Sequence, residues 1–336
     1  MRISDFDYDL PEARIAQHPV EPRDAARLLV DRGDSIAPEH RHVRDLPDLL
    51  RPGDVLVVND TRVIPARLRL QRASGGAAEV LLLEPRHGER RVWEALVRPA
   101  RKLGPGERLY ADGVAIVEVG ARTVAGDTFT VAILGDGDPL DLLARYGEMP
   151  LPPYITAPLA DRERYQTVYA REPASAAAPT AGLHLTEGVL DVIAALGIPL
   201  ARVELVVGLD TFQPISEDDP TRHPMHSERY GVPPETAAMT RDARRVVAVG
   251  TTAVRALESA ALTGEPEGRT RLFIHRPYAW NAVDVLMTNF HLPRTTLLMM
   301  IDAFIGPRWR RHYDVALDTG YRFLSFGDAL LLDRHA

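Results

Sequence analysis

The chain places Val55-Leu56-Val57-Val58 directly before Asn59-Asp60-Thr61-Arg62, so that an entirely apolar segment runs into a polar turn. Four consecutive apolar residues, three of them valine, predict a β-strand that is buried on both faces. Such strands belong to sheets covered by helices on both sides, and ligands bind beyond their carboxyl ends. We therefore take Asn59 and Arg62 as candidate substrate-binding residues. The alternative for Asn59 is that its amide only shapes the turn.

Strand and helix patterns alternate over much of the remaining chain, which predicts the α/β class. Continuous apolar runs predict strands, and apolar residues at a period of 3.6 predict helices. The predicted strands are 198–207, 246–249 and 283–287, and the predicted helices are 189–196, 253–261 and 295–305. We assign residues 1–65 and 155–336 to one large α/β catalytic domain.

Residues 66–154 have a different pattern, in which short β-type segments are separated by glycine-rich turns. The segments are 78–83, 92–97, 114–119 and 128–134, with a helix predicted at 140–146. This spacing is typical of a small all-β barrel or sandwich. Because it lies between two α/β segments, it is predicted to be an inserted small β-barrel domain.

Three further polar clusters lie where a predicted helix begins or a predicted strand ends. Pro179-Thr180-Ala181-Gly182-Leu183-His184-Leu185-Thr186 precedes the helix at 189–196, and it offers Thr180, Gly182 and His184. A capping or core histidine is the alternative for His184. Gly250-Thr251-Thr252 opens the helix at 253–261, where free N–H groups and Arg255 would suit an anion. Asn289 and His291 follow the strand at 283–287.

His226 and Glu228 form a fourth candidate, a general acid/base pair. On a strand, alternate residues project to the same side, so the two groups could act together. The spacing of the nearby His223 does not match a helix-borne His-x-x-x-His motif, and we predict no metal.

Composition excludes several classes of chemistry. The chain has no cysteine, which excludes disulfides, thiolate nucleophiles and iron–sulfur ligation, and its one lysine is Lys102. The net charge of −7 argues against general nucleic-acid binding but permits local arginine patches. We found neither a membrane-length apolar run nor a secretory signal, and so expect a soluble, cytoplasmic protein.

The chain resembles the S-adenosylmethionine:tRNA ribosyltransferase-isomerase family of queuosine biosynthesis, in motifs that follow one another over nearly its whole length. The matching stretches are 5–10, 59–68 (NDTRVIPARL), 149–154 (MPLPPY), 165–169 (YQTVY), 179–186 (PTAGLHLT), 225–228 (MHSE), 249–259 (VGTTAVRALES), 288–297 (TNFHLPRTTL) and 321–328. The resemblance implies a large α/β domain around a partly closed β-sheet, with an inserted small β-barrel.

The reaction implied by this resemblance uses S-adenosylmethionine as a substrate. The ribosyl group moves to the 7-aminomethyl-7-deazaguanine base (preQ1) of a tRNA with a GUN-type anticodon, giving epoxyqueuosine and releasing adenine and methionine. The sulfonium acidifies its neighbouring C5′ proton, so a neutral histidine or a carboxylate can abstract it. His184, His226, Glu228 and His291 are the candidate catalytic groups, and a monomer is expected.

Some positions depart from the family motifs. Val206 and Asp210 stand where the family has histidine and glycine, and His275-Arg276-Pro277 replaces a Tyr-Pro-Gly segment. These departures leave two alternatives open: a paralogue that transfers the ribosyl group to a small-molecule acceptor, or an inactive RNA-binding relative.

Overall fold

The computed structural model describes residues 1–336 except 87–89, 124–125, 127, 208–214, 216, 224 and 226. Its main element is a mixed sheet with the strand order β16-β14-β13-β3-β15-β17-β18-β1-β2. These strands are β16 (Glu267–Thr270), β14 (Glu228–Gly231), β13 (Leu200–Leu205), β3 (Asp54–Asn59), β15 (Arg245–Val249), β17 (Val285–Asn289), β18 (Ala329–Asp333), β1 (Arg27–Val30) and β2 (Glu39–His42). The central strands β13, β3, β15 and β17 are parallel, whereas β18 runs antiparallel to β17.

The strand β3 is buried on both faces, as its sequence predicted. All six of its residues are buried. Val55 and Val57 pack into one core, and Leu56 and Val58 pack into another on the opposite face. This division follows from the period of two along a strand, which sends successive side chains to opposite faces.

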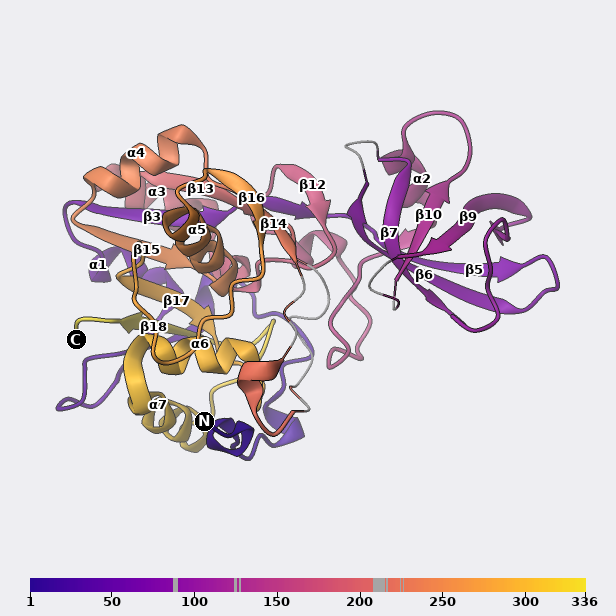
Figure 1. Cartoon of the computed structure of the whole chain (residues 1–336). Helices are drawn as coiled ribbons and strands as arrows, with labels where there is room; N and C mark the ends of the chain where they lie inside the picture. The colour runs from indigo at the N-terminus through magenta and orange to yellow at the C-terminus, as the bar shows by residue number, and fades with distance from the viewer. Residues whose placement is uncertain are drawn as a thin grey trace.

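Helices cover both faces of the sheet (Figure 1). The core containing Val55 includes residues of α5 (Thr251–Thr263), α6 (Thr296–Ile305) and α7 (Trp309–Asp318), while the core containing Leu56 includes residues of α1 (Leu46–Leu49) and α3 (Glu187–Ala195). A further helix, α4 (Pro234–Asp242), contacts β13. The α/β class predicted from the sequence is therefore confirmed.

A second sheet closes into a small antiparallel barrel, drawn in purple and magenta in Figure 1. Its strands are β5 (Arg67–Arg72), β6 (Ala77–Pro85), β7 (Val92–Arg98), β8 (Arg108–Ala111), β9 (Val114–Arg122) and β10 (Phe129–Ile133), with the short β11 (Gly147–Glu148) beside β5. Pairing between β5 and β8 closes the barrel. Trp93, Phe129 and Leu143 of α2 (Pro139–Tyr146) fill its core together with Ala176 from outside the barrel.

The predicted barrel was correct, although the sequence did not indicate β5 and β8. Arg67, Arg69 and Gln71 of β5 alternate with the buried Leu68 and Leu70. The two-stranded parallel pair β4 (Thr61–Val63) and β12 (Glu172–Ser175) lies where the chain passes between the two sheets.

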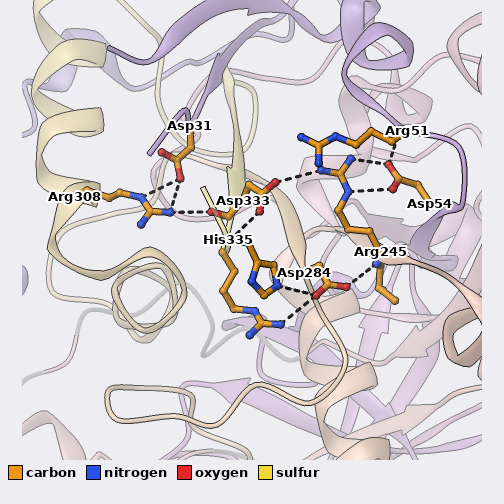
Figure 2. A network of polar contacts seen from close by, with 10 residues as sticks. Asp31, Arg51, Asp54, Arg245, Asp284, Arg308, Asp333 and His335 are labelled. Atoms are coloured by element: carbon orange, nitrogen blue, oxygen red, sulfur yellow. Dashed lines mark hydrogen bonds and ion pairs between the residues drawn. The ribbon is translucent and has the colours of Figure 1, made fainter. Parts of the chain in front are cut away.

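An ion-pair network joins the ends of several strands at the edge of the large sheet where β3 and β15 begin (Figure 2). Arg245 donates to Asp54 through Nε at 3.0 Å and Nη2 at 2.7 Å, and its Nη1 reaches Asp333 at 3.2 Å. Arg308 joins the same network through Asp31, at 2.9 Å from Nη2 to Oδ2, and through the Asp333 carbonyl. These ion pairs therefore hold the strand ends together at the edge of the large sheet that lies opposite Asn59 and Asn289.

Glu258 of α5 anchors the entry into β17 from within the core. Its side chain is fully buried and accepts hydrogen bonds from the backbone N–H groups of Asn281, Ala282 and Val283, at 3.0, 2.9 and 3.1 Å. Tyr278 Oη donates to it as well, at 3.1 Å. A carboxylate can accept all of these bonds at once because it carries no hydrogen.

Glu258→Gln should lower the free energy of unfolding by about 2–3 kcal/mol, because an amide NH₂ would face backbone donors in a buried site. Urea unfolding followed by circular dichroism measures this loss. Glu267→Gln is the matched control, since Glu267 is exposed on β16, and it should change stability by less than about 0.5 kcal/mol. Equal stabilities of the two variants would contradict the anchoring role.

Candidate functional site

A cavity opens beyond the carboxyl ends of β15 and β17, at the edge of the sheet opposite the ion-pair network. Helix starts, strand ends and the C-terminal loop all contribute to its wall. The lining residues are Tyr154, 178–181, Val207, 250–252, 288–292, Thr295, Leu297, Leu324 and Ser325. This is the position at which open α/β sheets bind ligands.

The N-terminus of α5 forms one side of the cavity. Gly250 has a φ of +90° in the turn from β15 into α5, a conformation that a residue with a side chain rarely adopts. The turn brings Thr251 and Thr252 to the cavity wall, both about nine-tenths buried or more. Thr252 Oγ1 is buried without a hydrogen-bond partner. The first turn of a helix also presents free N–H groups, so this corner favours a negatively charged group.

The Asn289 amide links the cavity wall to the stretch around His184. Its Oδ1 accepts a hydrogen bond from Thr180 Oγ1 at 3.0 Å, and its Nδ2 lies 2.9 Å from His184 Nε2 and 3.1 Å from the Leu324 carbonyl. The amide nitrogen can only donate, so His184 Nε2 is an acceptor. Asn289 therefore fixes the orientation of both Thr180 and His184.

His184 lies behind Asn289 and is not part of the lining of the cavity. Burial lowers its pKa to about 3, with further lowering by the positive charges of Arg322, Arg164 and Arg23. The imidazole is therefore neutral at pH 7, with its proton on Nδ1. His184 instead lines a second, smaller cavity.

His291 does line the main cavity. Its ring Nε2 lies 2.9 Å from Thr288 Oγ1. Its backbone N–H donates to Tyr313 Oη at 3.0 Å, and its backbone carbonyl accepts from Tyr8 Oη. Burial lowers its pKa to about 3 as well. The structure thus brings a second neutral imidazole to the edge of the cavity, a few residues beyond Asn289.

Asn59 and Arg62 lie away from this cavity. The Asn59 amide donates to the Leu205 carbonyl at 3.0 Å and accepts from the N–H groups of Thr61 and Leu205, so its groups are used to shape the turn. Arg62 pairs with Glu163 at 2.8 and 2.9 Å. The turn interpretation of Asn59 therefore matches its contacts.

Gly182 allows Tyr169 to pack closely against the backbone. A Cβ at this position would lie 1.9 Å from Tyr169 Oη, so no larger residue fits. Gly182 belongs to the 3₁₀-helix η6 (Thr180–His184), which is followed by α3 with Thr186 as its N-cap. The backbone N–H of Val189 donates to Thr186 Oγ1, and α3 begins two residues before the predicted helix 189–196.

Arg255 and Glu228 form a buried ion pair. Burial lowers the pKa of Arg255 to about 10, and its Nε also donates to the Leu272 carbonyl at 3.2 Å. Neither residue lines the cavity. His226, the predicted partner of Glu228, lies outside the described residues, and the acid/base pair stays a prediction. Within the part of the chain that the structure describes, no three His, Asp or Glu side chains cluster as a metal site would require.

Ser325, Leu324 and Tyr154 belong to the cavity wall but were not predicted as site residues. Tyr154 Oη and Ser325 Oγ lie 2.7 Å apart. The motif stretches that contain them were visible in the sequence. Only the fold brings these stretches, which are far apart along the chain, to the end of β17.

Among the motif departures, the side-chain contacts of Arg276 explain its residue type, whereas the hydrogen bond of Val206 is made by its backbone. Val206 is buried beside the lining residue Val207, and its N–H donates to the Arg229 carbonyl. Arg276 forms a bidentate pair with the buried Asp302 of α6, at 2.6 and 2.9 Å. Asp210 lies outside the described residues.

The comparisons with known proteins agree on one family. The model of the family described as "Queuosine biosynthesis protein" matches residues 3–332. The S-adenosylmethionine:tRNA ribosyltransferase-isomerase of Symbiobacterium thermophilum is 53% identical over 99% of this chain and 100% of its own length, and that of Thermus thermophilus is 50% identical over 97% and 98%. The crystal structure of S-adenosylmethionine tRNA ribosyltransferase from Thermotoga maritima is 36% identical, has a TM-score of 0.55, and is matched over 97% of this chain and 99% of that one.

The depressed pKa of His184 predicts that acid destabilises the fold. The unfolded chain takes up a proton near pH 6.5, whereas the folded imidazole stays neutral to about pH 3, so this contribution is complete above pH 6.5 and lost as the pH falls toward 3. Between pH 7 and pH 5, His184→Gln should lose on the order of 1–2 kcal/mol less unfolding free energy than the wild type. Urea unfolding at both pH values measures the difference. The exposed His18 supplies the control His18→Gln, and equal pH dependence in all three proteins would refute the assignment.

Proposed function

The chain belongs to the family of queuosine biosynthesis proteins, and we propose that the cavity at the carboxyl ends of β15 and β17 is its active site. The enzyme is an S-adenosylmethionine:tRNA ribosyltransferase-isomerase, with S-adenosylmethionine and tRNA as its substrates. The ribosyl group of S-adenosylmethionine passes to tRNA, and adenine and methionine leave. One observation carries the choice of cavity: it places a helix N-terminus with an unpaired hydroxyl beside a neutral histidine.

The methionine carboxylate of S-adenosylmethionine is placed at the N-terminus of α5. The free N–H groups of the first turn and the positive end of the helix favour an anion there. Thr252 Oγ1 is buried at the same corner and lacks a partner, so it can donate to a carboxylate oxygen. Gly250 gives the carboxylate a close approach to the backbone.

His291 is the group that we place against the ribosyl carbon. Its imidazole lines the cavity in the neutral form and can therefore accept the C5′ proton, which the adjacent sulfonium makes acidic. Thr288 holds the ring through Nε2. His184 acts indirectly. It holds the amide of Asn289, and Asn289 lines the cavity. Roles for His226 and Glu228 as an acid/base pair, and for Asn59, Arg62 and Arg255 in substrate binding, stay predictions.

The acceptor is proposed to be the preQ1 base at the wobble position of a tRNA with a GUN-type anticodon. Its aminomethyl nitrogen would attack the ribosyl carbons without a metal. We also propose that residues 66–154 form a domain separate from 1–65 and 155–336, and that the enzyme works as a cytoplasmic monomer. In the described residues, no helix is both long and apolar enough to cross a bilayer.

Adenine release tests the function directly. The protein is incubated with S-adenosylmethionine and with tRNA that carries preQ1, tRNA that carries guanine, or no tRNA, and free adenine and the digested nucleosides are analysed by mass spectrometry. Adenine and epoxyqueuosine are expected only with the preQ1 tRNA. Release without tRNA would identify a small-molecule acceptor, and tRNA binding without any release would identify an inactive relative.

Thr252→Val tests the carboxylate site. It removes a hydroxyl that has no partner in the free protein, so the unfolding free energy should change by less than about 0.5 kcal/mol. The dissociation constant for S-adenosylmethionine should rise about tenfold, because one hydrogen bond to a charged group is lost. Isothermal titration calorimetry measures it. Thr240→Val on α4, where the hydroxyl donates to the Thr236 carbonyl, is the matched control. Unchanged affinity in Thr252→Val would remove the carboxylate from this corner.

A further inference from the structure

A second cavity lies on the far side of His184 from Asn289. It is lined by Pro19, Val20, Arg23, Arg164, 183–184, Ser325 and Phe326. Ser325 lines both cavities, so the two are neighbours that share a wall. The second holds about 220 Å³ of empty space and the first about 600 Å³, each including some open solvent.

The imidazole of His184 can act as a donor toward this cavity. Its Nε2 accepts from Asn289, so the neutral ring carries its proton on Nδ1. His184 lines the second cavity, and Nδ1–H is the ring donor that the contact with Asn289 leaves unused. A neutral imidazole held in this tautomer suits an acceptor that is already an anion.

Two guanidinium groups complete the wall. Arg23 is held by the carbonyls of Gln166, Leu183 and Glu163. Arg164 donates to the Val20 carbonyl through Nη2 at 2.9 Å and its Nε pairs with Glu21 Oε1, whereas its Nη1 is buried and makes no hydrogen bond. The Arg164 guanidinium pairs electrostatically with Glu21, whose side chain is 67% exposed. Arg164 thus has one buried nitrogen, Nη1, whose N–H groups are free to donate, and a partner that solvent can reach.

We propose that this second cavity binds a phosphodiester group of the RNA substrate. Arg164, Arg23 and His184 Nδ1 supply donors for its oxygens, and arginine matches the geometry of phosphate. This inference rests on the proposed function, because the first cavity holds the reacting nucleotide. A nucleotide in one cavity then places its backbone phosphate in the other, on the shared wall at Ser325. In the free protein, Glu21 holds Arg164 and gives way to the phosphate.

RNA binding at several salt concentrations tests the proposal. An anticodon stem-loop RNA with preQ1 at the wobble position is titrated with the full-length protein by fluorescence anisotropy, between about 50 and 200 mM salt. Arg164→Gln should weaken binding about five- to tenfold and reduce the slope of log K against log salt by about 0.7, the value for one lost phosphate contact in a single strand. Arg241→Gln, at an exposed arginine of α4, should match the wild type.

Glu21→Gln gives the opposite sign and remains informative if Arg164→Gln folds poorly. It removes the carboxylate that competes with phosphate for Arg164, so RNA affinity should rise severalfold. If Arg164 served only to hold Glu21, RNA affinity in Glu21→Gln would stay at the wild-type value, and the proposal would be overturned.

A parallel titration with S-adenosylmethionine separates the two anions that the enzyme meets. Unchanged S-adenosylmethionine affinity in Arg164→Gln, with a reduced salt slope for RNA, supports a phosphate site. Loss of S-adenosylmethionine affinity with an unchanged slope would overturn it and assign the cavity to the methionine carboxylate. If the wild type did not bind the RNA at all, the proposed function would fail with it. If the wild type binds and Arg164→Gln shows the same slope, only this inference fails.

Discussion

Burial of β3 on both faces is the constraint on which the rest of the structure depends. Val55 and Val57 on one side and Leu56 and Val58 on the other need a separate core each, so the sheet must be covered twice. No polar side chain can then reach a ligand from the middle of β3. Polar groups at the ends of β3 and its neighbours lie at the two opposite edges of the sheet, and these edges have different roles. One holds the Arg245 network, and the other holds the cavity.

At the cavity edge, the chemistry depends on how neutral groups are oriented. Asn289 uses both ends of its amide, so Thr180 and His184 cannot rotate independently of β17. Burial keeps His184 and His291 uncharged, and in the proposed active site the helix N-terminus takes the anionic part of the substrate while the neutral His291 faces the ribosyl carbon. The two histidines share one protonation state, but their roles differ because only His291 lines the main cavity.

The sequence predicted the α/β class, the barrel and most of the elements that carry the site, because their signals are local. Apolar runs, periods of two and 3.6, and glycine turns depend only on neighbouring residues. Positions that depend on long-range packing could not be placed in this way. Asn59 has the same polar character as Asn289 and also ends a buried strand, yet its amide binds the Leu205 backbone while that of Asn289 faces the cavity. Likewise, nothing in the sequence distinguishes Arg255, paired with Glu228, from an arginine that meets substrate.

The pair between Arg276 and Asp302 bears on how the family can vary. Asp302 is buried, and it also accepts a hydrogen bond from Trp309 Nε1 at 3.0 Å. An unpaired carboxylate there would be costly, so neither position can be exchanged alone without loss of stability. The two sites are therefore expected to co-vary among relatives, with an acidic residue at the helix position accompanying arginine in the loop. The unusual His275-Arg276-Pro277 segment is then one half of a compensated change, and it need not imply a different substrate.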